Sequence, residues 1–340
     1  MKHFLMTLFA VGMVSLVSCG EKDNGENSAN GGNGGNNNGG GSERVEIRDG
    51  VLPGVFSVSE TKKVRFSMGN LQFSTDGSHD CADGNSQQGT WRFAARQYDF
   101  IGEDNQYISD SYSGYIDLFG WATSGYHDAS DNVNLYYMPY STSVEYDEIN
   151  NSYGYGPWYS DDSRNNLTGN FKNYDWGVFN AISNGGNAPN KWRTLTQDEW
   201  FYLLNRRAPA YSASMDSAMF CMATVCNVKG MIIFPDNYVH PADLSDLFDI
   251  NQYDGQYYRN EIDSETWNTI EKAGAVFLPA AGMRTMNDLN YTGLAGYYWS
   301  TDSYSQHGAT ALRFYDGYTN TNGYVSNRCV GYSVRLVQDI

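Results

Sequence analysis

A segment of almost pure glycine and asparagine separates the first residues of this chain from the part that can fold. Residues 20–42 read GEKDNGENSANGGNGGNNNGGGS and contain 9 Gly and 7 Asn. Such a composition leaves almost no apolar side chain to bury, so burial cannot offset the entropy cost of ordering the backbone. We expect a flexible coil with a reach of roughly 25–30 Å. Folding is therefore confined to the residues that follow.

The residues before this coil have the pattern of a lipoprotein signal peptide. Lys2 and His3 precede an apolar run from Phe4 to Val17, which is too short to span a hydrocarbon core of roughly 30 Å as a helix. The run ends in Leu-Val-Ser-Cys-Gly, which resembles a bacterial lipobox with Cys19 as the lipidated residue. We predict a signal peptide over 1–18, a lipidated tether over 19–43 and one domain over 44–340. The alternative is an ordinary secretory signal with a chance cysteine.

The residues just after Cys19 indicate where the lipoprotein resides. Glu21, Asp23 and Glu26 form an acidic cluster that resembles the export signals of surface lipoproteins in some Gram-negative lineages. We therefore expect an outer-membrane lipoprotein, exposed at the cell surface and held there by acyl chains such as palmitate on Cys19.

The charge balance excludes two classes of partner. The chain has 22 Lys and Arg against 39 Asp and Glu, a net charge of −17. This charge repels a phosphate backbone and an anionic lipid surface, so we expect no nucleic-acid binding and partners that are neutral or cationic. Five cysteines are too few for a disulfide scaffold, and no cysteine spacing matches a zinc site. A hydrophobic core must hold the fold, and the 27 tyrosines exceed what that core needs, so many should lie at or near the surface.

Two helices are predicted from their capping residues. Thr196 and Glu199 form a Thr-x-x-Glu capping box before an apolar run, which predicts a helix beginning at residue 197. A second helix is predicted over 265–272, with Asp263 or Ser264 as its N-cap and with Trp267 and Ile270 on its inner face.

The rest of the domain is predicted to consist of strands and long loops. Alternating apolar residues at 64 and 66 and again at 71 and 73 predict a hairpin within 54–73. Residues 98–160 are predicted to be long ordered loops, and short strands are predicted at 231–234 and 275–278. Alternation over 310–336 predicts antiparallel sheet at the carboxyl end, so the expected fold class is α+β.

Four segments together resemble a known family. They are WRTLTQDEW (192–200), GAVFLPAAGMR (274–284), GYYWST (296–301) and GYSVRLV (331–337). Their order and spacing resemble lipoproteins with a FISUMP-type domain, which are similar to the formylglycine-generating-enzyme-like branch of the C-type-lectin-like fold. The resemblance covers about residues 50–337. It implies two main helices beside twisted antiparallel sheets, with long ordered loops that carry recognition.

The catalytic and metal-binding residues of the related families are missing. Formylglycine-generating enzymes need a pair of reactive cysteines near the carboxyl end, where this chain has only Cys329. Cys221 and Cys226 are expected to be free thiols on opposite faces of a strand. The Ala-Pro-Asn string at 188–190 and the Phe-Pro-Asp string at 234–236 lack the first ligand of a calcium lectin. We therefore expect no enzyme, no metal and no cofactor, with a hydrolase as the remaining alternative.

The carboxyl-terminal segment has the composition of a binding surface. Residues 299–329 are rich in Tyr, Ser, Asn and Gly, which give large rigid contact areas with polar groups at little entropy cost. The predicted ligand-binding residues are Tyr304, His307, Arg313, Tyr315, Asp316, Tyr318, Asn320, Asn322 and Tyr324. We expect a lipid-anchored surface protein that binds an extracellular glycan or protein. The alternatives are an accessory subunit of a surface fibre or adhesin assembly, and a solvated exterior without a binding role. The same stretch also resembles the diversified segment of variable lectin-fold proteins.

Overall fold

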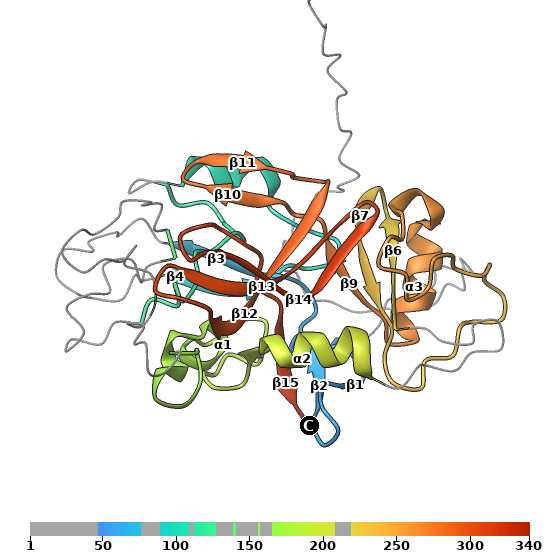
Figure 1. Ribbon diagram of the computed structural model, residues 1–340, viewed down its shortest axis with the longest axis horizontal. Coiled ribbons are helices and arrows are strands. Elements are labelled where there is room, and N and C mark those ends of the chain that lie inside the picture. Colours follow the sequence, from blue (N-terminus) through green and yellow to red (C-terminus); the bar gives the residue numbers. More distant parts are fainter. Residues whose placement is uncertain are drawn as a thin grey trace, which may run out of the picture. The chain divides into compact units, whose positions relative to one another are not determined.

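The computed structural model describes residues 47–75, 89–108, 112–126, 139–140, 156, 165–207 and 219–340, all within one compact unit, Ser42–Ile340. The predicted signal peptide and tether, with Cys19, lie outside the described residues, and so does Cys81. The described part is mixed α+β, with short sheets and a few short helices (Figure 1), so the predicted α+β class is confirmed. None of its helices has the length and apolar character that crossing a membrane requires.

The first sheet joins the beginning and the end of the unit. Its order is β1-β2-β15-β5, and its strands are β1 (Phe56–Ser57), β2 (Lys63–Phe66), β15 (Leu336–Asp339) and β5 (Arg193–Thr194). Val337 lies opposite Phe66 on one side of β15 and opposite Arg193 on the other, and all pairs are antiparallel. The last strand therefore pairs with residues far away in the sequence, so the sheet forms only when the whole unit is present.

The second sheet is an antiparallel meander of three longer strands. These are β12 (Ala295–Ser303), β13 (Gly308–Tyr315) and β14 (Tyr318–Asn327). Their two faces contact different parts of the core: Trp299 and Ala311 belong to one buried cluster, while Leu312 and Phe314 belong to another. The predicted alternation in this part of the chain is confirmed by these two strand faces.

The third sheet packs against the longest helix. Its order is β8-β6-β7-β9, and its strands are β8 (Glu261–Ile262), β6 (Phe220–Val225), β7 (Val228–Ile233) and β9 (Val276–Pro279). β8 runs parallel to β6, and the other pairs are antiparallel. Helix α3 (Ser264–Lys272) buries Trp267 and Ile270 in a third core cluster, where Trp267 contacts Phe277 at 5.7 Å between ring centroids. The strands predicted at 231–234 and 275–278 are confirmed as parts of β7 and β9.

Smaller elements connect these sheets. The hairpins are β3 (Leu71–Thr75) with β4 (Gly89–Phe93), and β10 (Met283–Thr285) with β11 (Asp288–Asn290). The remaining helical turns are η2 (Gly102–Tyr107), η3 (Gly169–Tyr174), α1 (Trp176–Phe179) and η5 (Tyr257–Arg259). Within 98–160, the described residues contain η2 but no named strand, in agreement with the predicted loops.

Both predicted helices are confirmed together with their caps. α2 (Gln197–Phe201) begins with the capping box of Thr196 and Glu199, and it continues as the π-helical turn η4 (Tyr202–Arg206). The N-cap of α3 is Asp263, whose side chain accepts a hydrogen bond from the backbone N–H of Thr266. An N-cap depends on residues within one helical turn, which is why sequence alone located the first residues of both helices.

The predicted pairing of the strand at 64–66 with the strand at 71–73 is wrong, although 54–73 does contain a short antiparallel pair, β1 with β2. β2 pairs with β1 and β15, whereas β3 pairs with β4 in a different sheet. Both segments bond to the carboxyl-terminal chain instead: Ser67 N–H donates to the carbonyl of Leu336, and Leu71 N–H donates to that of Val334. Strand alternation predicts that a strand exists, but it does not identify the partner.

Fewer tyrosines lie at the surface than their number in the sequence predicted. Six are at most 2% exposed: Tyr174, Tyr238, Tyr257, Tyr297, Tyr298 and Tyr332. Three of their hydroxyl groups donate to oxygen atoms inside the protein: that of Tyr257 to the carbonyl of Leu294, that of Tyr298 to the carbonyl of Pro279 at 2.7 Å, and that of Tyr332 to the hydroxyl of Ser326. A tyrosine with a bonded hydroxyl can be buried like phenylalanine. Others, including Tyr304 and Tyr318, are exposed as predicted.

Candidate functional site

One face of the β12-β13-β14 sheet holds a cluster of tyrosines around a central arginine. Residues directly opposite in an antiparallel sheet share a face, as do residues two apart on a strand. Three rows therefore lie on this face: Ala295–Tyr315–Tyr318, Tyr297–Arg313–Asn320 and Trp299–Ala311–Tyr324. We define the tyrosine face as Tyr297, Arg313, Tyr315, Tyr318, Asn320 and Tyr324.

The guanidinium group of Arg313 lies close to four aromatic rings. Its central carbon is 4.7 Å from the ring centroid of Tyr324, 5.0 Å from that of Tyr315, 5.7 Å from that of Tyr297 and 5.8 Å from that of Tyr318. A cation within about 6 Å of an aromatic face is attracted by the ring quadrupole.

Burial decreases from one side of the tyrosine face to the other. Tyr297 is 2% exposed, and its ring stacks on Tyr332 at 4.8 Å, which anchors it to the core. Tyr318 on the outer strand is 38% exposed and stacks on Tyr315 at 4.8 Å. Arg313, the central residue, is half-buried. The face therefore has a rigid buried side and an accessible side.

No carboxylate among the described residues forms an ion pair with the positively charged Arg313. None of the ion pairs among the described residues involves Arg313, and its Nε is buried there without a hydrogen-bond partner. Its polar neighbour is Tyr297. Burial raises the pKa of Tyr297, while the charge of Arg313 and a hydrogen bond with its side chain act in the opposite direction.

Two glycines give the outer strand its path. Gly317 has φ +74° in the two-residue turn between β13 and β14, which places Tyr315 directly opposite Tyr318. Gly323 has φ +81° in a bulge, where the register shifts between the Ala311 and Arg313 pairs. A left-handed φ strains any residue with a Cβ. These turns bring the side chains of β14 over the centre of the face.

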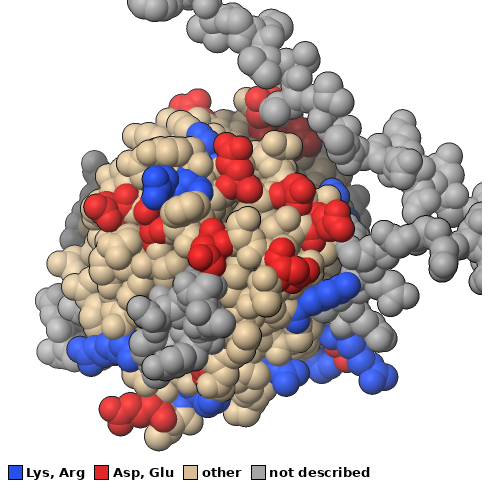
Figure 2. Space-filling view, turned by 90° about the vertical axis from the view of Figure 1, so that its right-hand side faces the viewer, with Lys and Arg blue, Asp and Glu red and all other residues tan. Residues whose placement is uncertain are grey.

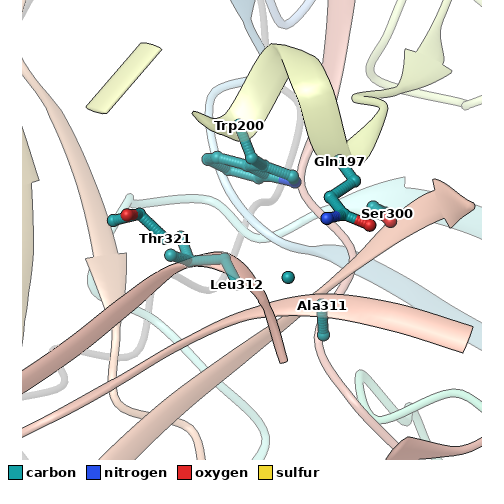
Figure 3. Close-up of a pocket in the computed structure, with 7 residues that line it drawn as sticks. Gln197, Trp200, Ser300, Ala311, Leu312 and Thr321 are labelled. Carbon is teal, nitrogen blue, oxygen red and sulfur yellow. The ribbon is translucent and has the colours of Figure 1, made fainter. Parts of the chain in front are cut away.

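Helix α2 packs beside β13 and β14 without leaving a cavity large enough for a ligand. Gln197 and Trp200 point from the helix towards Leu312 and Thr321 (Figure 3). The pocket between them has an empty volume of about 160 Å³. Small-molecule sites usually enclose roughly 300–1,000 Å³. This pocket is therefore smaller than a usual small-molecule site.

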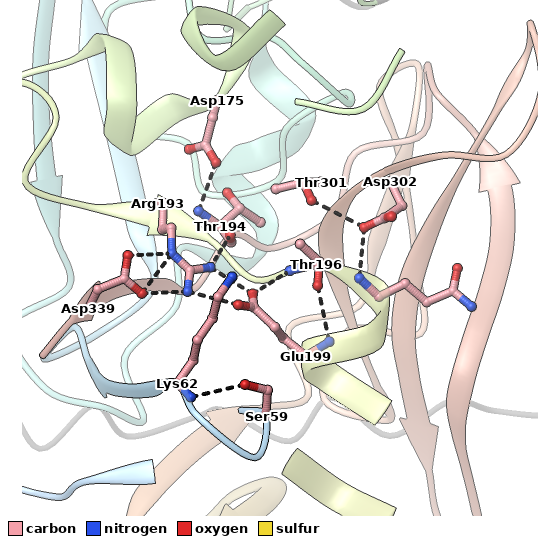
Figure 4. Close-up of polar contacts among 11 residues, drawn as sticks. Ser59, Lys62, Asp175, Arg193, Thr194, Thr196, Glu199, Thr301, Asp302 and Asp339 are labelled. Atoms are coloured by element: carbon pink, nitrogen blue, oxygen red, sulfur yellow. Dashed lines mark hydrogen bonds and ion pairs between the residues drawn. The ribbon is translucent and has the colours of Figure 1, made fainter. Parts of the chain in front are cut away.

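A network of charged groups fixes α2 in place (Figure 4). Arg193 of β5 donates to both carboxylate oxygens of Glu199 at 2.7 and 2.9 Å, and it also pairs with Asp339 of β15. Burial disfavours the charge of Arg193, but the hydrogen bonds with Asp339 and Glu199 outweigh it and raise its pKa. From β12, Asp302 accepts a hydrogen bond from Gln197 N–H at 2.7 Å. Three elements therefore hold the start of α2.

Two predicted ligand residues lie at the other end of the β12-β13 hairpin. Tyr304 and His307 belong to the connection between these strands, whereas Arg313 is near the end of β13. The carbonyl of His307 accepts a hydrogen bond from Arg328 N–H, and the pKa of its side chain is lowered by burial and by the charge of Arg328. Tyr304 is 49% exposed. The structure does not bring these two residues to the tyrosine face.

Asp316 and Asn322 interact with neighbouring elements. The carboxylate of Asp316 accepts a hydrogen bond from Tyr257 N–H at 2.9 Å, which links the hairpin turn to η5. Asn322 is exposed in the bulge, and its carbonyl accepts a hydrogen bond from Gln197 of α2. Of the nine predicted residues, the structure brings together Arg313, Tyr315, Tyr318, Asn320 and Tyr324.

Sequence reasoning missed Tyr297. The motif at 296–301 was assigned to the scaffold, because nothing local shows which of two adjacent tyrosines shares a face with Arg313. Both are buried: Tyr297 lies opposite Arg313 and belongs to one core cluster, while Tyr298 belongs to another and stacks on Phe314. The spacing of Tyr297 to Trp299 gave a signal for a shared face, but only the strand register assigns that face to Arg313.

The cysteines of the described residues are free thiols. Cys221 is buried in β6, Cys226 follows in the turn, and Cys329 is buried. Burial raises the pKa of all three thiols, which keeps them protonated at neutral pH. The expected absence of a bond between Cys221 and Cys226 agrees with this arrangement.

The described residues contain no group of three or more His, Cys, Asp or Glu side chains placed to hold a metal ion. Asp236, in one of the two proline-containing strings considered above, already accepts hydrogen bonds from Ser57 and pairs with Lys63 and Arg207. Burial opposes ionisation of Asp236, but the bonds with Ser57 and the charge of Arg207 lower its pKa. Its role is therefore structural.

The charge distribution affects what can approach the molecule. Figure 2 shows many acidic side chains on one face of the unit, with several basic side chains near its lower margin. Exposed acids around α3 include Asp243, Asp246, Asp254, Glu261, Asp263 and Glu265. This surface repels polyanions at long range.

Comparison with known proteins gives no relative from which a function can be transferred. No family model, no curated protein and no solved structure matches this chain.

Proposed function

We propose that this chain is a lipid-anchored cell-surface protein that binds an extracellular glycan or protein through its tyrosine face. Cys19 anchors it to the outer membrane of a Gram-negative bacterium, and the Gly/Asn-rich tether lifts the folded unit from the bilayer. The protein acts by binding rather than by catalysis, without a cofactor and without nucleic acid.

The arrangement around Arg313 carries this proposal. The guanidinium group of the half-buried Arg313 lies within 6 Å of four tyrosine rings, of which that of Tyr318 is exposed. Tyrosine and arginine are the residues most enriched among the strong contacts of binding surfaces. Rigid aromatic rings also lose little entropy when a ligand settles on them. The buried side of the face, anchored by Tyr297, supports these contacts without needing to rearrange.

The proposed fold is C-type-lectin-like, as the resemblance implies. Pairing of β2 with β15 at the centre of one sheet, two capped helices and long connections support this assignment. The tyrosine face then belongs to the carboxyl-terminal strands, the stretch that resembles the diversified segment of variable lectin-fold proteins.

A glycan and protein array tests the proposal. The full-length chain in detergent is compared with the Tyr315→Ala/Tyr318→Ala double variant, which removes the stacked pair from the accessible side. Loss of both rings should weaken binding of the main hits by at least about tenfold, since each strong aromatic contact contributes on the order of 1 kcal/mol or more.

Tyr304→Ala provides the matched control, because it removes an equally large exposed ring from the opposite end of the same sheet. Its binding should stay within about twofold of wild type, a difference below 0.5 kcal/mol. Thermal melting checks that all variants fold. Equal binding of every hit by the wild type and the double variant would exclude the tyrosine face as the ligand site.

An accessory role in a surface fibre is the second candidate, and the edge of β14 favours it. β14 is a terminal strand of its sheet, and its ten residues carry no charged side chain. Uncharged edge strands can pair with a strand of another chain. A photo-crosslinker at Val325, which is 39% exposed, would join the chain to a fibre subunit in intact cells if this role applies.

A further inference from the structure

We propose that the ligand of the tyrosine face is an acidic sugar, such as a sialic or uronic acid, whose carboxylate binds Arg313. This inference rests on the proposed function and specifies the chemical group that is recognised.

The first support is that few groups of the protein satisfy the guanidinium group of Arg313. The fully buried Arg284 donates to the carbonyls of Met286 and Leu118, and the fully buried Arg335 donates to the side chains of Asn70 and Gln97. Among the described residues, the half-buried Arg313 makes no ion pair and its Nε has no hydrogen-bond partner, while its side chain hydrogen-bonds with that of Tyr297. A guanidinium group has five N–H donors, so most of them still need acceptors.

The second support is the match between a guanidinium group and one carboxylate. The planar fork of arginine binds both oxygens of a carboxylate in parallel, and the partly dry surroundings of four rings strengthen such charged hydrogen bonds. Phosphate groups are usually bound by clusters of basic residues. Arg313 is the one basic residue of the tyrosine face, so a single negative charge is the better match.

The third support is the character of the groups beside Arg313. Tyr318 and Tyr315 offer ring surface for the C–H face of a sugar, and Asn320 lies next to Arg313 with an amide that can bond to hydroxyl groups. Side-chain rows on a sheet are spaced by about 4.8 Å across strands and about 6.8 Å along them. The face is therefore wide enough for the end of a short oligosaccharide.

The net charge of −17 predicted neutral or cationic partners, and Arg313 is a local exception to that expectation. Salt screens charges that lie more than about 8 Å apart at physiological ionic strength. A single carboxylate in contact with Arg313 is therefore attracted by this arginine more strongly than it is repelled by distant acidic residues. Repeating polyanions extend beyond that range and meet the acidic surface. A terminal acidic sugar fits both conditions.

The first test changes the ligand and keeps the protein unchanged, by calorimetric titration of the full-length chain in detergent. The probes are the methyl glycosides of N-acetylneuraminic acid and of glucuronic acid, each compared with its neutral methyl ester. The free acid should bind at least about tenfold more tightly than the ester, because a charge-assisted hydrogen bond contributes roughly 1.5–3 kcal/mol. Equal affinity for acid and ester, or no binding of either acid, would overturn the proposal.

Two variants with the same net charge then locate the contact. Arg313→Gln should reduce binding of the acid to the level of the ester. Arg206→Gln removes an exposed arginine from η4 and should leave the affinity within about twofold of wild type, less than 0.5 kcal/mol. Equal losses in both variants, or none in Arg313→Gln, would contradict a specific contact. Arg313→Lys keeps the charge without the planar fork, so partial binding is expected even if Arg313→Gln folds poorly.

Further probes separate this inference from the proposed function. N-acetylaspartate amide and inorganic phosphate should bind at least tenfold more weakly than the sugar acids; equal binding would overturn the assignment to a sugar. If array hits are neutral glycans that depend on Tyr315 and Tyr318 but not on Arg313, the acidic-sugar inference fails while the proposed function stands. If no ligand depends on Tyr315 and Tyr318, both fail.

Discussion

At the scale of single residues, Arg313 contributes to stability as well as to the proposed binding. Its guanidinium group contacts rings on all three strands of the sheet, since Tyr297, Tyr315 and Tyr324 come from β12, β13 and β14. These contacts hold the rings in place before any ligand arrives. Preorganisation of this kind lowers the entropy cost of binding.

Replacing Arg313 by lysine should therefore lower the free energy of unfolding by about 1 kcal/mol. Lysine keeps the positive charge, but its compact ammonium group cannot stack flat on several rings, and cation–π contacts at partly exposed sites contribute roughly 0.5–1 kcal/mol or more. Urea unfolding measures the change. The control Arg206→Lys, at an exposed position with one ring contact, to Phe201 at 5.0 Å, should lose less and stay within about 0.5 kcal/mol of wild type. Equal stability of both variants would mean that the rings do not hold the arginine.

At the scale of elements, α2 connects the charged network to the edge of the proposed site. Its first residue, Gln197, donates to the carbonyl of Asn322 in the bulge of β14. A side chain at Gly323 would collide with Gln197, so the glycine permits this close approach. The position of α2 thereby affects the shape of the outer strand.

Loss of the α2 cap should lower stability by about 1 kcal/mol. In Thr196→Ala, the hydroxyl that accepts a hydrogen bond from Glu199 N–H is gone, while Thr196→Ser keeps it. Urea unfolding should show the loss only in the alanine variant. Ligand binding by Thr196→Ala should change by less than about twofold, since the tyrosine face contains no residue of α2; a larger loss would mean that the helix itself contributes to the site.

The elements that sequence predicted correctly are those specified by nearby residues. Thr196 with Glu199, and Asp263 with the N–H of Thr266, act within one turn of helix. Pairing between strands has no such local code: β2 and β3 were predicted to form a hairpin, yet each pairs elsewhere. The candidate site was predicted in part for the same reason. Composition indicated β13 and β14, but the contribution of Tyr297 depends on the register with β12.

At the scale of the whole molecule, two buried carboxyl groups link stability to pH. Asp117 accepts hydrogen bonds from Asn105 and from Ile101 N–H, and Asp175 accepts them from the N–H groups of Thr194 and Gly177. Asp117 thereby joins its loop to the segment around η2, and Asp175 joins the start of α1 to β5. Burial raises the pKa of each to about 6, although these hydrogen bonds act to lower it.

The direction of the pH effect follows from proton binding. In the unfolded chain these carboxyl groups ionise near pH 3.8, whereas in the folded protein they keep their protons up to about pH 6. Between these values the folded state binds more protons, so its stability decreases as the pH rises. The contribution of each group is fully present below about pH 4 and is lost above about pH 6. A shift of about two pKa units corresponds to on the order of 3 kcal/mol for each group.

Urea unfolding between pH 4 and pH 7 measures this contribution in Asp117→Asn and Asp175→Asn. Asparagine is neutral at every pH, so each variant should lack one titrating group, and its stability relative to wild type should improve by on the order of 1–3 kcal/mol as the pH rises. Asp246→Asn removes the same charge from an exposed position, so its curve should run parallel to that of wild type. If the two buried-site variants also run parallel to wild type, these carboxyl groups ionise alike in both states, and the decline in stability must come from other groups.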